Sequence, residues 1–261
     1  MDIVVCIKQV PETSAIPWDP TTGSLIRDGV EGILNPNDKN ALEAALQIRE
    51  QDGGTITALS MGPCQAEDTL REALSMGVDK AILLNDSLFA GSDTLATSYA
   101  LHLAIKRISR FDLILCGRES WDAMTAHVGP QLSELLNLPQ LTYATEITIH
   151  TNSVTIKQKL EDGFRVLESP LPALITVEKE MNQPRIPSME SIMNAYRDKE
   201  VVVWSHEHLG EDTARFGLKG SPTQSRAVYS KKMHKGNVTM LEGKPDEVAR
   251  NLIQILRQKG L

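Results

Sequence analysis

The stretch from residue 116 to residue 131 combines residue types that suit the binding of an anion. An apolar run ends at Cys116, Gly117 follows, and a polar loop then leads into apolar residues with helical spacing. α/β proteins hold phosphate groups in this arrangement, because the free N–H groups of the helix face the end of the preceding strand. Asp122 is placed to cap this helix, and Thr125 adds a hydroxyl group near its first turn. The alternative is a capped helix without a ligand.

Motifs of other nucleotide-binding and catalytic sites are absent from the sequence. It has no Gly-x-Gly-x-x-Gly fingerprint, no Walker loop and no nucleophile elbow. His206 and His208 suggest a metal pair, but the sequence places no acidic or cysteine ligand beside them, so we expect solvated loop histidines. We therefore predict neither a catalytic side chain nor a metal site. Any chemistry would belong to a bound cofactor that the protein positions.

Apolar runs alternate with helical patterns over the first part of the chain, and this predicts a parallel sheet with helices on both faces. The runs cover residues 3–7, 55–61, 81–84 and 112–116. Asn37 or Asp38 is expected to cap the first helix, and Ser92 or Asp93 to cap the third. Ligands of such folds bind at the carboxyl ends of the strands. The loops after the strands, near Lys8, Met61, Asp93 and Asp122, therefore meet at one edge.

The pattern changes in the second half of the chain. From Thr142, period-two alternation across short turns predicts an antiparallel meander at one edge of the sheet. Residues 205–237 are polar and are expected to form an extended arm, and a helix with one apolar face follows from Pro245. We predict an α/β domain at residues 1–204 and a C-terminal arm and helix at residues 205–261 that pack on another subunit.

Composition excludes several classes of protein. The net charge of −7 and the absence of a basic cluster argue against nucleic acid. No apolar run approaches the roughly 18 residues that span a bilayer, so we expect no membrane insertion. The three cysteines lie far apart without metal-binding spacing, and the N-terminus does not resemble a signal peptide. We expect reduced cysteines in a cytoplasmic protein.

Several motifs, taken in their order, resemble those of electron transfer flavoprotein β subunits. The motifs are Lys8-Gln9-Val10, Asn35-Pro36, Gly117-Arg118, Asp122, Thr125-Ala126, Val128-Gly129-Pro130-Gln131, Asn182-Gln183-Pro184-Arg185 and Ile192-Met193-Asn194-Ala195. The resemblance covers nearly the whole chain and implies an adenine-nucleotide-binding, HUP-like α/β domain. The sequence departs from the expected family pattern at Glu119-Ser120-Trp121 and at His127.

Thr94 and Thr97, together with the form of the central loop, resemble the subset whose β subunit holds FAD rather than AMP. The resemblance assigns to the FAD a set of residues around the central loop and the third helix: Asp93, Thr94, Thr97, Asp122, Thr125, Ala126, Val128, Gly129 and Gln131. It assigns Cys6, Asn35 and Met61 to the AMP half of the same cofactor. A β subunit with structural AMP is the first alternative.

In that subset, as the resemblance implies, the β subunit takes a hydride from NADH and bifurcates the electrons. One electron goes to ferredoxin or flavodoxin, and the other goes through the FAD of the α subunit to a flavin dehydrogenase. The chain would thus be the electron-transfer subunit of an NADH-oxidising heterodimer. Met181, Asn182, Pro184 and Arg185 would contact the dehydrogenase, although Met181 could instead fold back onto the core. A non-redox nucleotide-binding protein resembling the stress proteins is the second alternative.

Overall fold

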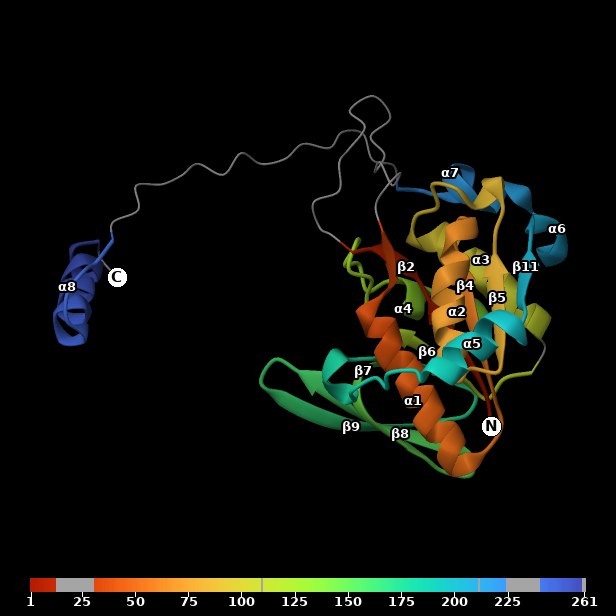
Figure 1. The fold of residues 1–261 in the computed structure, drawn as a ribbon, viewed down its shortest axis with the longest axis horizontal. Coiled ribbons are helices and arrows are strands. Elements are labelled where there is room, and N and C mark those ends of the chain that lie inside the picture. The colour runs from red at the N-terminus through yellow and green to blue at the C-terminus, as the bar shows by residue number, and fades with distance from the viewer. Residues whose placement is uncertain (13–30, 109, 211, 224–239, 260–261) are drawn as a thin grey trace. The chain divides into compact units, whose positions relative to one another are not determined.

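The computed structural model describes residues 1–12, 31–108, 110–210, 212–223 and 240–259 (Figure 1). The chain divides into two compact units, Met1–Arg226 and Ala227–Leu261. The first unit holds the sheet and most of the helices, and the second holds one helix. The division falls later than the predicted boundary after residue 204.

A nine-stranded sheet forms the centre of the first unit, in the order β11-β5-β4-β1-β6-β10-β7-β8-β9. Neighbours from β11 to β7 are parallel, whereas β8 and β9 run antiparallel as an edge meander. The predicted fold class is therefore confirmed. The strands are β1 (Asp2–Ile7), β4 (Thr55–Met61), β5 (Lys80–Leu84), β6 (Leu113–Gly117), β7 (Gln140–Ile149), β8 (Ser153–Leu160), β9 (Gly163–Pro170), β10 (Ala173–Val177) and β11 (Val201–Trp204). A separate hairpin pairs β2 (Gln9–Pro11) with β3 (Gly32–Leu34).

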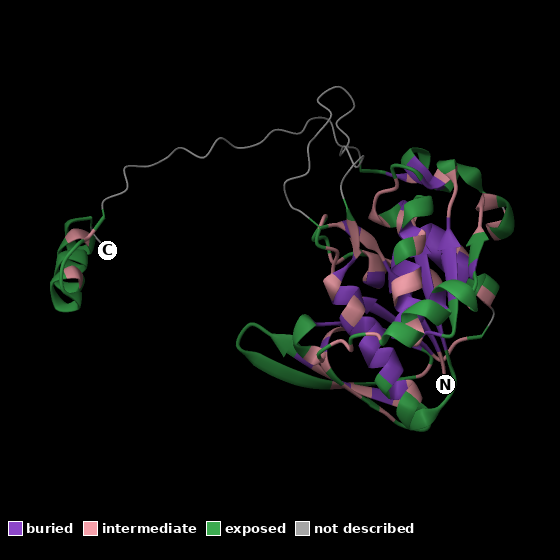
Figure 2. Ribbon diagram, in the orientation of Figure 1, coloured by how far each residue is buried: buried purple, intermediate pink, exposed green. Residues whose placement is uncertain are grey.

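Helices cover both faces of the sheet, as the continuous apolar runs of the central strands require. In β1, Ile3, Val5 and Ile7 belong to one buried cluster, while Val4 and Cys6 belong to the other. The first cluster includes residues of α1 (Pro36–Asp52), α2 (Glu67–Met76) and α5 (Met189–Arg197). The second includes residues of α3 (Thr94–Ile108) and α4 (Val128–Leu136). Figure 2 shows the buried strands between these two helical layers.

The predicted cap of the first helix is wrong, and that of the third helix is right. α1 begins at Pro36 with Asn35 at its N-cap position, so Asn37 and Asp38 lie inside its first turn. Their side chains bond to other segments of the chain instead. Asp93 does cap α3, because its carboxylate accepts hydrogen bonds from the N–H groups of Leu95 and Ala96.

Within the first unit, two short helices follow β11 and contact α3: α6 (His206–Leu209) and α7 (Gly217–Gly220). His206 is not a solvated loop residue, because its Nδ1 lies 2.5 Å from Asp86 Oδ2. His208 bonds within the cap of α6, where its Nδ1 accepts from the N–H group of Ser205. The rest of the predicted arm, at residues 224–239, lies outside the described residues.

The second unit contains α8 (Pro245–Gln258). Asp246 and Glu247 lie in its first turn and Arg257 in its last, in the order that complements the helix dipole. Large apolar side chains of α8, including Leu252 and Leu256, are exposed. In the part of the chain that the structure describes, no helix combines the length and apolar character needed to cross a bilayer.

Candidate nucleotide site at the carboxyl edge of the sheet

The order in which the chain adds strands to the sheet reverses between β1 and β6. The chain runs from β1 through α1 to β4 on one side of β1. It later runs from β5 through α3 to β6 on the other side of β1. Because α1 and α3 pack on opposite faces, the two connections leave a crevice beside the carboxyl ends of β1 and β6. Lys8 follows β1 directly, and Gly117 is the last residue of β6.

A buried carboxylate closes the bottom of this crevice. Asp38 Oδ2 accepts a hydrogen bond from the N–H of Lys8 at 2.8 Å, and Oδ1 accepts one from the N–H of Gly117 at 3.1 Å. Burial raises the pKa of the Asp38 carboxyl to about 7, although these bonds and one from Asn35 favour its ionised form. A Cβ atom at residue 117 would collide with the Asp38 carboxylate, so glycine is required there.

The loop after β6 is held by amide side chains at the start of α1. Asn35 Nδ2 and Asn37 Nδ2 both donate to the carbonyl oxygen of Glu119, at 3.0 and 2.9 Å. Asn35 Oδ1 also accepts from the N–H of Trp121 at 3.2 Å. Asn35 therefore lies at the predicted site, where it fixes the backbone of the loop.

Asp122 does not cap α4, contrary to the prediction from the sequence. Its two carboxylate oxygens lie 2.6 and 2.7 Å from Lys8 Nζ. Lys8 Nζ also donates to Ser120 Oγ at 3.4 Å. Asp122 is six residues before the first residue of the helix, Val128, and so lies beyond the position of a capping side chain. The ion pair instead ties the loop to the end of β1.

The N-terminus of α4 is available to an anion. His127 occupies its N-cap position, and its side chain makes no capping hydrogen bond. The N–H groups of the first turn and the positive end of the helix dipole therefore face the loop. Gly129 is buried against β10, and a Cβ atom at this residue would lie 2.6 Å from Thr176 Cγ2. The helix start can approach the sheet this closely only with glycine.

The first turns of α3 and α4 lie side by side and bring other predicted residues together. Ser98 Oγ donates to the carbonyl oxygen of Thr94 at 2.7 Å, and it lies 3.3 Å from both the carbonyl oxygen of Val128 and Gln131 Oε1. Thr94 and Thr97 are half-buried on α3. The two threonines thus lie in the helix that Ser98 joins to α4.

Asp93 has a structural role in this arrangement. Besides capping α3, its carboxylate accepts from the N–H of Thr223 at 3.0 Å, and its own N–H donates to Ser221 Oγ at 2.8 Å. Burial opposes ionisation, but the hydrogen bonds from Ala96, Thr223 and Leu95 lower the pKa of Asp93 below its ordinary value. An ionised Asp93 thus anchors residues 221–223 beside the start of α3.

The end of the loop adopts an uncommon backbone conformation. Met124 and Ala126 have φ angles of 49° and 54°, in the left-handed region that residues with a Cβ seldom occupy. Thr125 lies between them and is exposed. Strained backbone of this kind is concentrated at binding sites, where the surrounding structure must hold it in place.

Cys6 and Met61 lie on β1 and β4, deeper than the loop residues. Cys6 is buried and pairs in register with Cys116 across the parallel strands. The Cys116 thiol donates to the Cys6 sulfur, and this bond, together with burial, raises the pKa of Cys116 well above its usual value, which keeps this thiol protonated. Met61 is half-buried and packs on the second core cluster.

Three residues that hold the site together were not predicted as site residues: Lys8, Asp38 and Ser98. Lys8 carries a usable signal in the sequence, because it is the first residue after a buried strand that reaches the ligand edge. Asp38 resembles an ordinary residue of a helical first turn, and Ser98 resembles a polar residue within a helix. Only the packing of distant segments reveals the roles of these two.

The predicted partner loop is anchored on α1. Asn182 and Asn40 exchange hydrogen bonds, with Asn182 Nδ2 donating to the Asn40 carbonyl at 3.0 Å and Asn40 Nδ2 donating to Asn182 Oδ1 at 2.9 Å. Arg185 Nε lies 2.8 Å from Glu43 Oε2 and its Nη1 lies 2.6 Å from Glu50 Oε1. Pro184 is half-buried between them.

Met181 precedes this anchored segment. It is half-buried and packs against the first core cluster, which is the alternative that the sequence left open for this residue. Contact of Met181, Asn182, Pro184 and Arg185 with a partner remains a prediction.

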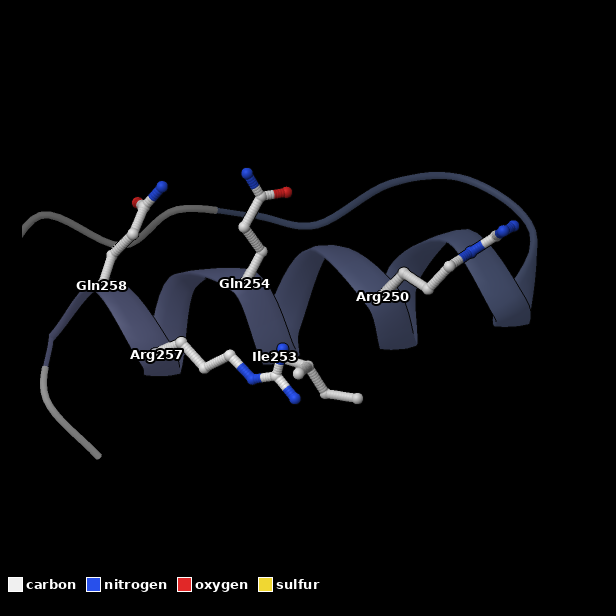
Figure 3. A pocket seen from close by; sticks show the side chains of 5 residues that line it. All are labelled: Arg250, Ile253, Gln254, Arg257 and Gln258. Atoms are coloured by element: carbon white, nitrogen blue, oxygen red, sulfur yellow. The ribbon is translucent and has the colours of Figure 1, made fainter.

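An open hollow on α8 is a weaker candidate for a ligand site. Its lining comes from a single helix, and Figure 3 shows the side chains extending away from the helix. The lining residues are Arg250, Ile253, Gln254, Arg257 and Gln258. In the described residues, no group of three or more histidine, cysteine or acidic side chains is placed to hold a metal. The carboxyl edge of the sheet is therefore the best candidate site.

Known proteins are similar in sequence to this chain along nearly its whole length. The electron transfer flavoprotein domain matches residues 22–209. An electron transfer flavoprotein subunit beta from Thermoanaerobacterium thermosaccharolyticum is 46% identical over 259 residues, which cover 99% of each chain. The caffeyl-CoA reductase-Etf complex subunit CarD of Acetobacterium woodii is 44% identical over the full length of both chains. Protein FixA of Azorhizobium caulinodans is 44% identical and covers 93% of this chain and 89% of its own.

Proposed function

Because the chain belongs to the electron transfer flavoprotein family as a β subunit, we propose that it binds FAD at the carboxyl edge of its sheet and receives electrons from NADH. When bound, the flavin supplies the redox chemistry, which consists of accepting a hydride and releasing its electrons singly to two acceptors. One acceptor is ferredoxin or flavodoxin, and the other is the FAD of the α subunit. The β subunit itself binds, orients and shields the cofactor.

The observation that carries this proposal is the uncapped start of α4 beside the anchored loop at the strand switch. The N–H groups of α4 suit the diphosphate of a dinucleotide. Val128, Gly129 and Gln131 would approach it from α4, and Asp122, Thr125 and Ala126 from the loop. Thr94 and Thr97 would reach the cofactor from α3, with Asp93 holding the start of that helix.

We place the adenosine half of the cofactor on the side of α1 and β4. Asn35 fixes the loop there, and Met61 lies at the end of β4. Cys6 is buried beneath the crevice, so its contribution would come from its main chain or its packing. These three residues remain our candidates for the AMP half of FAD.

Electrons would leave the complex through a partner flavoprotein. The name of CarD describes a complex that contains caffeyl-CoA reductase and an Etf, and this supports a similar association for the present chain. We propose a heterodimer with an α subunit in the cytoplasm, which delivers electrons to a flavin dehydrogenase. Met181 and the Asn182–Arg185 segment would form part of the contact with that dehydrogenase.

A β subunit with structural AMP, without bifurcation, is the alternative from the same family. It would use the same α4 start for a single phosphate, and it would not need the threonines of α3. The family membership removes the other alternative, a non-redox stress-protein-like domain.

The deciding experiment is the nucleotide content of the complex. The chain is co-expressed with its α subunit, the purified heterodimer is denatured, and FAD and AMP are quantified. Two FAD and no AMP per heterodimer are expected, together with NADH-dependent reduction of ferredoxin or flavodoxin. One FAD and one AMP would contradict the proposal.

A matched pair of variants tests the role of α3. Thr94→Val/Thr97→Val removes both hydroxyl groups, and we expect it to lower the FAD content of the β site. Thr151→Val makes the same exchange in an exposed turn between β7 and β8, far along the chain from the site, and should retain both flavins. Equal retention by both variants would show that the α3 threonines do not hold the cofactor.

A further inference from the structure

Trp121 displays an aromatic surface at the rim of the nucleotide site. Its side chain is 47% exposed, although its backbone is among the best anchored parts of the loop. Among the described residues, no aromatic or cationic group is recorded in contact with its ring. Trp204, by contrast, has the guanidinium of Arg107 over its ring at 5.3 Å.

The backbone on both sides of Trp121 is fixed. The carbonyl oxygen of Glu119 accepts from Asn35 and Asn37, and the N–H of Trp121 donates to Asn35. On the other side, Asp122 is paired with Lys8. An exposed ring on an immobilised backbone loses little conformational freedom when a planar ligand binds against it.

Lys8 binds the backbone neighbours of this ring. Its side chain is 40% exposed, and its Nζ contacts Ser120 and Asp122, the two residues that flank Trp121. An aromatic face on the loop that leads into α4 complements a ligand that has both a planar ring and phosphate groups. Nucleotides are the common ligands with this chemistry.

From these observations we propose that Trp121 is a stacking platform for a heteroaromatic ring of a dinucleotide at this edge. This inference rests on the proposed function. The ring is either the flavin of the bound FAD or the nicotinamide of the electron donor, and both offer the planar surface that indole stacks on.

The test compares three variants in the complex with the α subunit. Trp121→Ala removes the ring, Trp121→Phe keeps a smaller one, and Met189→Ala removes an exposed apolar side chain from α5, outside the site. NAD+ affinity is measured by calorimetry, and FAD retention and the visible flavin spectrum are measured during dialysis. Thermal unfolding confirms that each variant is folded.

We expect Trp121→Ala to lower the affinity for one of the two ligands, NAD+ or FAD, about ten-fold. One ring stacked on an aromatic side chain contributes roughly this factor to binding. Trp121→Phe should recover most of the loss, and Met189→Ala should match the unmodified complex. Weaker NAD+ binding identifies the nicotinamide as the stacked ring, and loss of FAD with an altered flavin spectrum identifies the flavin. Unchanged values of both in Trp121→Ala overturn the inference.

Failure of the proposed function would be visible separately. If the unmodified complex contains AMP and binds no NAD+, the bifurcating role is wrong, and the same three variants are then compared for AMP retention. Retention of AMP by Trp121→Ala at the level of Met189→Ala would overturn the stacking role in that case as well.

Discussion

Asp38 determines which groups at the strand switch remain available to a ligand. Its carboxylate accepts the N–H groups of Lys8 and Gly117, which are the main-chain donors at the ends of β1 and β6. A phosphate at this edge therefore cannot use these two donors. It must be bound by the loop and by the start of α4, so a single side chain shifts the anion position away from the strands.

The raised pKa of Asp38 predicts a specific pH dependence of stability. The ordinary value of 3.8 describes the unfolded chain, and the folded protein has a pKa of about 7. Between these values the folded state keeps a proton that the unfolded state has released. The contribution is therefore complete below pH 4 and is lost as the pH rises towards 7. Each unit of this difference is worth roughly 1.4 kcal/mol.

Asp38→Asn removes this titration. We expect the thermal midpoint of the complex to fall between pH 5 and pH 8 in the unmodified protein and to fall less in the variant. The variant should also be less stable at every pH, because one amide oxygen cannot replace two carboxylate acceptors. Asp198→Asn is the control, since it removes an equal charge from an exposed residue. A parallel pH course for all three proteins would contradict the prediction.

At the scale of elements, the approach of α4 to β10 positions the candidate anion site. Gly129 allows it, because a Cβ atom there would lie 2.6 Å from Thr176 Cγ2. Gly129→Ala should displace the start of the helix and destabilise the protein by about 1–3 kcal/mol, as overpacking does in other cores. Chemical denaturation of the complex measures this change, and FAD retention should fall with it.

Thr176→Ser provides a direct check of the steric cause. It removes Cγ2 and keeps the hydroxyl group, which accepts a hydrogen bond from the N–H of Tyr143. Combined with Gly129→Ala, it should recover much of the lost stability, so the effects of the two substitutions should not add. Additive losses would show that the glycine acts through backbone entropy and not through its contact with β10.

The predicted partner loop is also fixed in place by side-chain bonds, in this case to α1. Arg185 binds Glu43 and Glu50 of α1, and Asn182 bonds to Asn40 of the same helix. Burial alone would raise the pKa of Glu43, but the hydrogen bonds from Arg185 outweigh it and lower the pKa. The polar residues of this sequence motif thus fix the loop to the helix, and the exposed apolar side chain of Ile186 follows directly after it.

The sequence predicted the elements better than their ends. Buried strands such as β1 and β6 are recognisable because both of their faces must be apolar, and the ligand edge follows from the order of strands and helices. Asp122 was misplaced as a cap because a cap is a local interaction, whereas its actual partner, Lys8, is 114 residues away in the sequence. The role of Asp38 was not predicted for the same reason, because its two hydrogen-bond donors come from β6 and from the residue after β1.

At the scale of the whole molecule, the chain consists of two units of different character. The first buries an extensive core between two helical layers, whereas α8 in the second leaves most of its apolar residues exposed. Val248, Leu252, Ile255 and Leu256 recur at helical spacing and form one face. Such a face is typical of a helix that packs on another surface, and in a β subunit the α subunit is our candidate for that surface.

This assignment predicts that the apolar face of α8 contributes to heterodimer affinity. Leu252→Gln/Leu256→Gln keeps good helix formers but removes two leucines from the face, which should weaken the heterodimer by roughly 3 kcal/mol or more, about a hundred-fold. Dissociation of the purified complex on dilution measures the change. The control is Arg250→Gln/Arg257→Gln, which places the same residue type twice on the opposite side of the same helix. If both double variants dissociate alike, or if neither does, α8 does not pack on the α subunit through its apolar face, and the second unit needs a different partner.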